Sequence, residues 1–176
     1  MTITQNGDVV NYSKAGTLRT AEMVVLAPVG FTGTATFTPA AASHTNGDVH
    51  GGAQEIEFTP EPLSGSRIRI VSATLQINGG TVETTTWRLH LFNVTPPSAL
   101  ADDAAFTLAS GDRASYLGYV DFAQVVDMGD TLYIETTDIQ KQLLLAGTSL
   151  FGYLVNGTTL TPQAVAHVVT LQCVAV

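Results

Sequence analysis

Hydrophobic and polar residues alternate along most of this chain, in short runs that Gly, Pro, Asn and Asp interrupt. The clearest runs cover Thr85–Val94, Thr131–Glu135, Ser149–Val155 and Val165–Val176. Ser149–Val155 is apolar at almost every position, which is typical of a strand buried on both faces. No window of about a dozen residues has the apolar spacing of three and four that marks an amphipathic helix. The pattern predicts an all-β fold, an antiparallel β-sandwich or jelly roll.

Alternation also assigns faces within these runs. In Thr85–Val94 one face holds Trp87, Leu89 and Leu91, and the other holds Arg88 and His90. In the C-terminal run, Val165, Val169, Leu171 and Cys173 share one face, and Thr170 and Gln172 share the other. We therefore expect Cys173 to be a small buried hydrophobic residue and not a reactive thiol. Since it is the only cysteine, an internal disulfide is excluded.

The segment Arg67–Asn78 changes its parity partway along. Ile68 and Ile70 share one face, whereas the following apolar residues, Val71, Ala73, Leu75 and Ile77, have the opposite parity. A strand can change parity only where a residue is inserted or the strand bends. We therefore predict a β-bulge near Ile70-Val71.

Four short clusters of Gly, Asn, Ser and Asp predict turns between strands. Asn78-Gly79-Gly80 predicts a hairpin-type turn, and further turns are predicted at Ser110-Gly111-Asp112, Met128-Gly129-Asp130 and Asn156-Gly157. The only candidate for a helical turn is Ser98–Ala105, because two prolines precede it and Ser98 is a suitable N-cap.

The first part of the chain differs from the rest. Its start is polar and punctuated by glycine, Ala21–Val29 forms one apolar run, and Phe31–Pro39 alternates Phe and Thr with small residues. Ser43–Gly52 is rich in His, Asn, Asp and Gly, as loops are. We therefore expect an extended N-terminal arm with edge strands over residues 1–45, followed by a β-sandwich domain over residues 46–176.

Composition narrows the classes of function. The net charge of −8 comes from 15 acidic and only 7 basic residues, and the basic residues are scattered, so nucleic-acid binding is not expected. No apolar stretch approaches the roughly 20 residues of a membrane span, and the start has no signal-peptide pattern. We expect a soluble protein made in a reducing cytoplasm. Because only 12% of the residues are charged, a neutral polar surface suited to contact with partners is expected.

The segment Ser43–Gly52 holds the one pattern that suggests a metal. His44, Asp48 and His50 supply two imidazoles and a carboxylate, which can bind zinc or iron. A cupin would instead place a His-x-His pair on a strand, with a further His and Glu along the chain. The spacing here favours a flexible or partner-ordered polar loop. A cupin-like metalloenzyme stays an open alternative.

Other chemical patterns are weak. Asp102, Asp103 and Asp112 lack the spacing of a calcium-binding loop. The acids Glu55, Glu57, Glu83 and Glu135 are expected to be solvated at the surface, and Ser64, Ser66 and Ser149 lack the context of a nucleophile. Six aromatic residues could form a sugar-stacking face if they are exposed: Trp87, Phe92, Tyr116, Tyr119, Phe151 and Tyr153. Alternation places most of these six in the core. We expect no enzyme, and no catalytic, cofactor-binding or metal-binding residues.

Three stretches together resemble a known family. Ala42–Gly52, Trp87–Phe122 and Gly147–Val155 resemble small proteins encoded beside the major capsid protein of tailed bacteriophages, which are head decoration, or capsid-cementing, proteins. The resemblance implies a β-sandwich or jelly-roll body, frequently trimeric, that binds the major capsid protein on the outside of the virion and has no catalytic residues. The alternative is a carbohydrate-binding or receptor-binding jelly-roll module of a phage tail or spike, which requires exposed aromatic residues.

Overall fold

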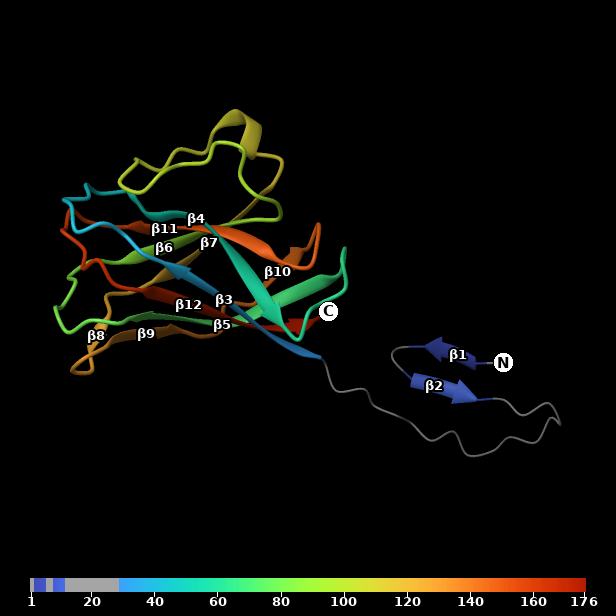
Figure 1. The fold of residues 1–176 in the computed structure, drawn as a ribbon. Coiled ribbons are helices and arrows are strands. Elements are labelled where there is room, and N and C mark those ends of the chain that lie inside the picture. The colour runs from blue at the N-terminus through green and yellow to red at the C-terminus, as the bar shows by residue number, and fades with distance from the viewer. Residues whose placement is uncertain (1, 6–7, 12–28) are drawn as a thin grey trace.

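The computed structural model describes residues 2–5, 8–11 and 29–176 and is built almost entirely from strands, as the alternation predicts. Within these residues there are twelve strands and one short 3-10 helix, η1 (Figure 1). Their bounds are β1 (Thr2–Gln5), β2 (Asp8–Asn11), β3 (Gly30–Phe37), β4 (Val49–Thr59), β5 (Arg67–Ile77), β6 (Trp87–Phe92), η1 (Ser110–Asp112), β7 (Tyr116–Phe122), β8 (Val126–Asp127), β9 (Leu132–Thr136), β10 (Lys141–Leu144), β11 (Leu150–Asn156) and β12 (His167–Ala175).

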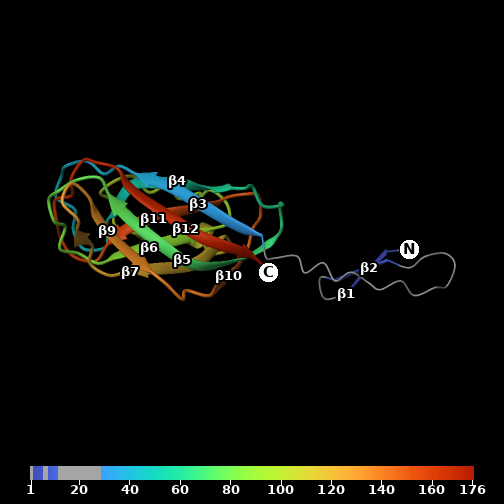
Figure 2. The same cartoon turned by 90° about the horizontal axis from the view of Figure 1, so that it is seen from below.

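The strands form two layers that pack face to face (Figures 1 and 2). Every pair is antiparallel, and the strand order is β7-β6-β11-β4-β3-β12-β5-β9-β8, with β10 paired to the first part of β5. Strand β4 joins the layers, because residues 49–56 pair with β11 whereas residues 57–59 pair with β3. The predicted antiparallel sandwich is therefore confirmed. Strands β1 and β2 form a separate two-stranded sheet.

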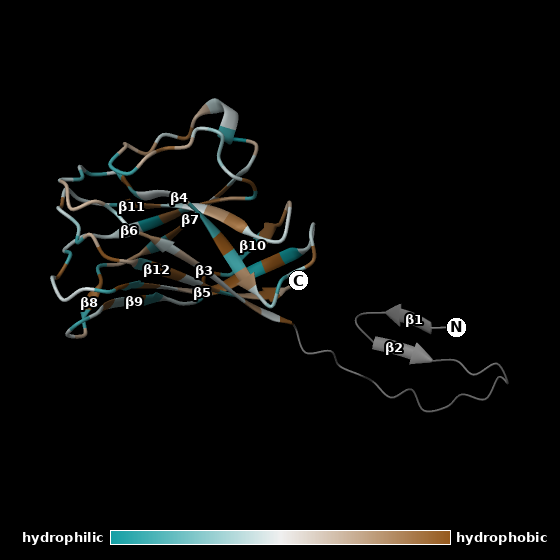
Figure 3. Ribbon diagram, in the orientation of Figure 1, coloured by the Kyte–Doolittle hydropathy of each residue, from teal (hydrophilic) through white to brown (hydrophobic). Residues whose placement is uncertain are grey.

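The main hydrophobic core lies between the inner faces of the two layers. Trp87, Leu89 and Leu91 of β6 are buried there, as are Val169, Leu171 and Cys173 of β12. Strand β5 in Figure 3 shows the alternation of hydrophilic and hydrophobic residues that such a half-buried strand requires. The predicted faces of both strands are thus confirmed. No helix in the described part of the chain has the length and hydrophobicity needed to cross a membrane.

The predicted β-bulge is present in β5. Ser72 lies opposite Gln172 and Ile70 lies opposite Cys173, so Val71 is the extra residue. On either side of Val71 the buried residues are Ile68 and Ile70, then Ala73, Leu75 and Ile77. The inserted residue lets both halves of the strand present their apolar side chains to the same core.

A second, smaller hydrophobic cluster lies on the outer face of the layer that contains β6, β11 and β4. Residues 93–115, here named the covering segment, pack over it and are closed at the base by a hydrogen bond from the Asn93 amide to the Ser115 carbonyl. Phe92 and Tyr153 are buried beneath this segment, and the Tyr153 hydroxyl accepts a hydrogen bond from the Leu100 amide. The covering segment explains why β11 is apolar on both faces.

The helical turn predicted over Ser98–Ala105 is wrong. That stretch makes two separate turns, in which Ala99 and Asp103 have positive φ angles of 42° and 64°. The Ser98 side chain donates to the buried carboxylate of Asp112 and does not cap a helix. The helical turn lies instead at η1, where a simple turn was predicted over Ser110-Gly111-Asp112.

The other predicted turns have mixed outcomes. Met128-Gly129-Asp130 does join β8 to β9 as a hairpin, and the chain also bends at Gly157, directly after β11. A bend follows Ile77 as well, but the hairpin predicted at Asn78-Gly79-Gly80 is wrong. Strand β5 pairs with β12 and β9, while the next strand, β6, belongs to the other layer.

Two predictions for the first part of the chain are corrected. Strand β3 is not an edge strand, because it pairs with β12 on one side and β4 on the other. Ser43–Gly52 is not wholly a loop, because β4 begins at Val49 and bulges at Gly51 and Gly52, whose φ angles are 70° and 72°. The glycines therefore allow a bulge and do not mark a loop. Residues 1, 6–7 and 12–28 of the predicted arm, which include the run Ala21–Val29 except for its last residue, lie outside the described residues.

Deleting Val71 alone should be tolerated. Ile70 stays opposite Cys173 and Ser72 opposite Gln172, so the apolar side chains keep facing the core, and only the hydrogen bond to the Val71 carbonyl, about 0.5–1.5 kcal/mol, is lost. Deleting Val71 and Ser72 together places Ile70 opposite Gln172 and turns Ile68 and Ile70 away from the core. Because each buried isoleucine contributes roughly 1.5–3 kcal/mol, we expect the free energy of unfolding in urea to fall by about 3–6 kcal/mol in the double deletion. Equal losses in both variants would contradict this role of the bulge.

The thiol of Cys173 should be unreactive in the folded protein. Burial raises its pKa to about 12, so the nucleophilic thiolate is scarce at neutral pH. We expect a thiol reagent such as Ellman's reagent to react only as fast as the protein unfolds. Rapid reaction in the absence of denaturant would show that this part of β12 is accessible.

Candidate functional site

Three of the four histidines gather at one end of the sandwich. His50 lies at the start of β4, His167 begins β12, and His44 precedes β4 in a short bridge with Leu160. All three histidines are fully buried. The ring of His50 lies 4.3 Å from that of His44 and 6.0 Å from that of His167, centroid to centroid. With Trp87, whose ring lies 4.7 Å from that of His50, these residues form what we call the histidine cluster.

The two outer histidines of the cluster fasten connections between strands. His44 contacts the Ala42 carbonyl through Nδ1 at 3.1 Å and the Asp102 carboxylate through Nε2 at 3.2 Å. His167 likewise contacts a carbonyl at 3.0 Å and the buried Glu83 carboxylate at 3.2 Å. Both ring nitrogens of His44 and of His167 therefore have a polar contact. The cluster ties the covering segment and the β5–β6 connection to the sandwich.

The central histidine, His50, has no hydrogen-bond partner for either ring nitrogen within the described residues. Burial lowers its pKa to about 3, the neighbouring His44 and His167 act in the same direction, and Asp102 and Asn156 act in the opposite direction. His50 is therefore neutral at physiological pH. Two nearby buried atoms, Nε1 of Trp87 and Oδ1 of Asn156, also lack partners.

The residues of the possible metal site do not converge. The Asp48 carboxylate accepts hydrogen bonds from the amide and hydroxyl of Thr45, so it closes a local turn. His44 is engaged by Asp102 and His50 stacks beside it. The described residues contain no group of three or more His, Cys, Asp or Glu that could hold a metal ion. The favoured alternative, a flexible or partner-ordered polar loop, is wrong, because His44, Asp48 and His50 are all buried within the chain itself.

The predicted acidic residues also have separate structural roles. Asp102 accepts hydrogen bonds from the amides of Ala40 and Gly51 and from His44. Although burial alone would raise the pKa of Asp102, these hydrogen bonds lower it below its ordinary value. Asp112 is buried, whereas Asp103 lies at the surface. Glu55, Glu57 and Glu135 are exposed as predicted, but the prediction is wrong for Glu83, which is buried against His167.

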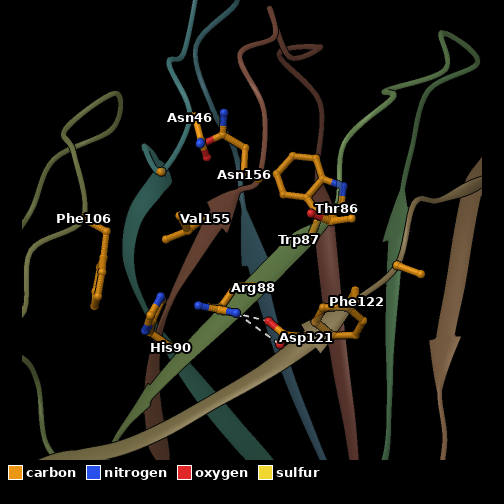
Figure 4. Close-up of a pocket in the computed structure, with 13 residues that line it drawn as sticks. Asn46, Thr86, Trp87, Arg88, His90, Phe106, Asp121, Phe122, Val155 and Asn156 are labelled. Carbon is orange, nitrogen blue, oxygen red and sulfur yellow. Dashed lines mark hydrogen bonds and ion pairs between the residues drawn. The ribbon is translucent and has the colours of Figure 1, made fainter.

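A groove of about 610 Å³ lies on the outer face of β6 and β7, beside the covering segment (Figure 4). Arg88 and Asp121 lie at its base, joined by hydrogen bonds of 2.6 and 3.2 Å. Phe106 of the covering segment forms one side, and Asn46 and Asn156 lie at one end. The groove is the part of this outer face that the covering segment leaves open.

The side chains around the groove are fixed by stacking. The Arg88 guanidinium lies 3.9 Å from the centre of the Tyr119 ring. His90 stacks on Phe106 with 3.7 Å between centroids, and its Nδ1 lies 2.9 Å from the Tyr116 hydroxyl. Burial, and secondarily the charge of Arg88, lower the pKa of His90 to about 4, so this ring is uncharged at neutral pH.

The aromatic residues divide much as the alternation predicts. Trp87, Phe92 and Tyr153 are buried, whereas Tyr119 is 46% exposed beside the groove. Phe106 was not among the predicted candidates, although it forms one wall of the groove. It lies in the covering segment, where no strand periodicity assigns a face to any residue.

Comparison with known proteins identifies no family. No protein-family model matches the chain, and no curated protein matches it. Among solved structures, a chain in a semi-empty virus-like particle of the nodavirus of the giant freshwater prawn Macrobrachium rosenbergii is similar over 88% of this chain and 96% of its own length. The two chains are 13% identical and superpose with a TM-score of 0.31, values too low to indicate a shared function.

Acid should destabilise the protein through His50 and His90. Unfolding restores their ordinary pKa near 6.5, so below that pH the unfolded state binds protons that the folded state refuses. The stabilising effect of keeping these rings neutral is complete above about pH 6.5 and is lost as the pH falls toward 3–4. The free energy of unfolding should therefore decrease steadily with acidification over this range.

Replacing His50 by Gln isolates the contribution of His50 to this pH dependence of stability. Near pH 5 the slope of unfolding free energy against pH should fall by about 1.4 kcal/mol per pH unit, the value for one proton. Combining His50→Gln with His90→Gln should lower this slope by about a further 1.4 kcal/mol per pH unit. An unchanged slope, or an imidazole signal of His50 that titrates near pH 6.5 by NMR, would contradict the burial argument.

Proposed function

We propose that this protein is a virion structural protein that binds the outside of a phage capsid and stabilises the shell. Its partner would be the major capsid protein, and it would act as a homo-oligomer, with a trimer favoured, and without catalysis. The sequence resemblance in Ala42–Gly52, Trp87–Phe122 and Gly147–Val155 supports this role, and the β-sandwich agrees with what the resemblance implies.

Most of the buried ionisable side chains stabilise the fold, which is consistent with a structural role. His44, His167, Asp102 and Glu83 hold connections of the fold in place. His50 is enclosed and neutral at physiological pH. These side chains are engaged in stabilising one conformation, which is what a protein that acts by adhering to its neighbours needs.

The observation that carries the proposal is an apolar surface at the end of the sandwich opposite the histidine cluster. There, backbone hydrogen bonds and strand pairing bring together the residues around Arg67 (Figure 1). Four of them expose large apolar side chains, with Leu63 82% exposed, and we call them the apolar end: Val29, Leu63, Leu144 and Val176. Exposed apolar groups that cluster in this way mark interaction sites. Many copies, each with a modest contact, would stabilise an assembled shell by mass action and avidity.

Shell binding tests this role directly. Full-length protein should co-sediment saturably with purified capsid shells that lack it, and it should raise the temperature at which those shells come apart. Leu63→Ser should weaken binding roughly tenfold or more, because one buried leucine contributes about 1.5–3 kcal/mol. Met128→Ser, which changes a 69% exposed side chain at the other end of the sandwich, is the matched control and should bind normally.

The possible outcomes test the proposed function and the proposed contact surface separately. If full-length protein does not bind shells, the proposed function is wrong. If it binds but Leu63→Ser and Met128→Ser bind equally well, the apolar end is not the contact surface.

Removing residues 1–20 should weaken shell binding while the sandwich stays folded. The strands of the sandwich begin at Gly30, and β1 and β2 pair only with each other, so circular dichroism and the unfolding transition should change little. An arm that contacts the shell adds reach and contact area. A truncated protein that saturates shells with unchanged affinity would contradict a role for the arm.

The second candidate function is a carbohydrate-binding or receptor-binding module of a phage tail or spike. One observation favours it: the groove has a half-buried aromatic wall, Phe106, and an exposed tyrosine, Tyr119, beside it. Such a module would be present in few copies on each particle, whereas a decoration protein would be present in many.

A further inference from the structure

The groove over β6 and β7 has the dimensions of a ligand site. Its volume of about 610 Å³ lies within the roughly 300–1,000 Å³ that small-molecule sites usually have. One wall is Phe106, and polar side chains lie at the base and at one end (Figure 4). A mixed lining of this kind, apolar on one side with a few converging polar groups, is what orients a small polar ligand.

The charges in the groove cancel. Arg88 is the only Lys or Arg among the residues that line it, and its guanidinium is already engaged by Asp121 and by the ring of Tyr119. The neighbouring His90 is uncharged at neutral pH. A phosphate, sulfate or carboxylate would therefore find no free cation to compensate its loss of water, and a cation would find no free carboxylate. The groove favours a neutral ligand.

The hydrogen-bonding groups that remain suit hydroxyl groups. The side chains of Arg88 and Asp121 are 44% and 56% exposed, so the pair presents adjacent donors and acceptors to the groove. A guanidinium has five N–H donors and a carboxylate about four acceptor sites, more than their mutual contact uses. Asn46 and Thr86, both exposed at the rim, add further donors and acceptors. Neighbouring hydroxyls on a ring can donate to Asp121 and accept from Arg88 at once.

The aromatic wall supplies the apolar half of such a contact. Phe106 is half-buried, and one face of its ring is stacked on His90, which in turn contacts the Tyr116 hydroxyl, so the stacked pair lines this side of the groove. A rigid ring of this kind offers contact area with little loss of side-chain entropy. The C–H face of a sugar ring matches it, because that face is apolar while its edge carries hydroxyls.

We propose that this groove binds a neutral carbohydrate, with a sugar ring against the stacked Phe106–His90 pair and adjacent hydroxyls on the Arg88–Asp121 pair. The site is additional to shell decoration and does not depend on contact with a capsid. A protein that coats a particle could in this way also hold the particle on a glycan surface.

Arg88 lies at the base of the groove, so its side-chain Nε–H gives a specific reporter. This N–H, held against Asp121, contributes its own signal to the ¹H–¹⁵N NMR spectrum of the full-length protein. We would titrate lactose, maltose, cellobiose and N,N′-diacetylchitobiose, and probe an array that holds neutral, sialylated and sulfated glycans. At least one neutral glycan should shift the Arg88 Nε–H signal saturably, with weaker or no binding by its sulfated counterpart.

Substitutions assign the binding to the groove. Arg88→Gln and Phe106→Ala should each weaken the affinity for the neutral glycan roughly tenfold or more, since each removes a central contact. Arg113→Gln changes an exposed arginine outside the groove and should leave the affinity unchanged. If Phe106→Ala does not fold, Arg88→Gln and Asp121→Asn carry the test.

Three results would overturn the proposal. One is the absence of any shift at the Arg88 Nε–H together with an array that shows no binding. A second is binding that Arg88→Gln and Asp121→Asn leave unchanged, and a third is binding confined to anionic glycans. None of these results bears on shell binding, which is measured separately with capsid shells.

Discussion

The packing of two sheets through their inner faces is the interaction on which the rest of this structure depends. Each strand must present its apolar side chains to one interior, and two strands achieve this only through irregularities. Val71 is inserted in β5, and β4 bulges at Gly51 and Gly52 before it crosses from one layer to the other. A shift by one residue would turn a whole set of apolar side chains to water, so these irregularities fix the register.

The same constraint explains why polar residues are buried at one end. Where strands leave the sandwich, their connections need partners inside it, and the histidine cluster supplies them. His44 reaches Asp102 of the covering segment, and His167 reaches Glu83 in the β5–β6 connection. The covering segment in turn shields the outer face of β11 and leaves the groove beside it. The cluster and the groove are therefore consequences of how the sandwich closes its ends and faces.

Much of the sandwich was predictable from the sequence, because alternation is a local signal. The faces of β6 and β12 and the bulge in β5 follow from parity alone. The histidine cluster was not predictable from the sequence, because His44 and Asp102 are 58 residues apart in the chain and His167 and Glu83 are 84 residues apart. The resulting error was to treat buried acids and histidines as a solvated surface and a loop. Residues such as Phe106 lie in a segment without periodicity, where only the tertiary fold assigns a role.

A weakly charged surface with exposed apolar side chains at one end suits a protein that acts by binding to many neighbouring subunits. Such a role requires stoichiometric amounts, because every copy stabilises only the subunits that it touches. The most direct measurement is the copy number of this protein in purified virions, by quantitative mass spectrometry against the major capsid protein. If the protein decorates the shell, hundreds of copies per particle are expected. A handful of copies would contradict this role and would indicate a tail or spike component.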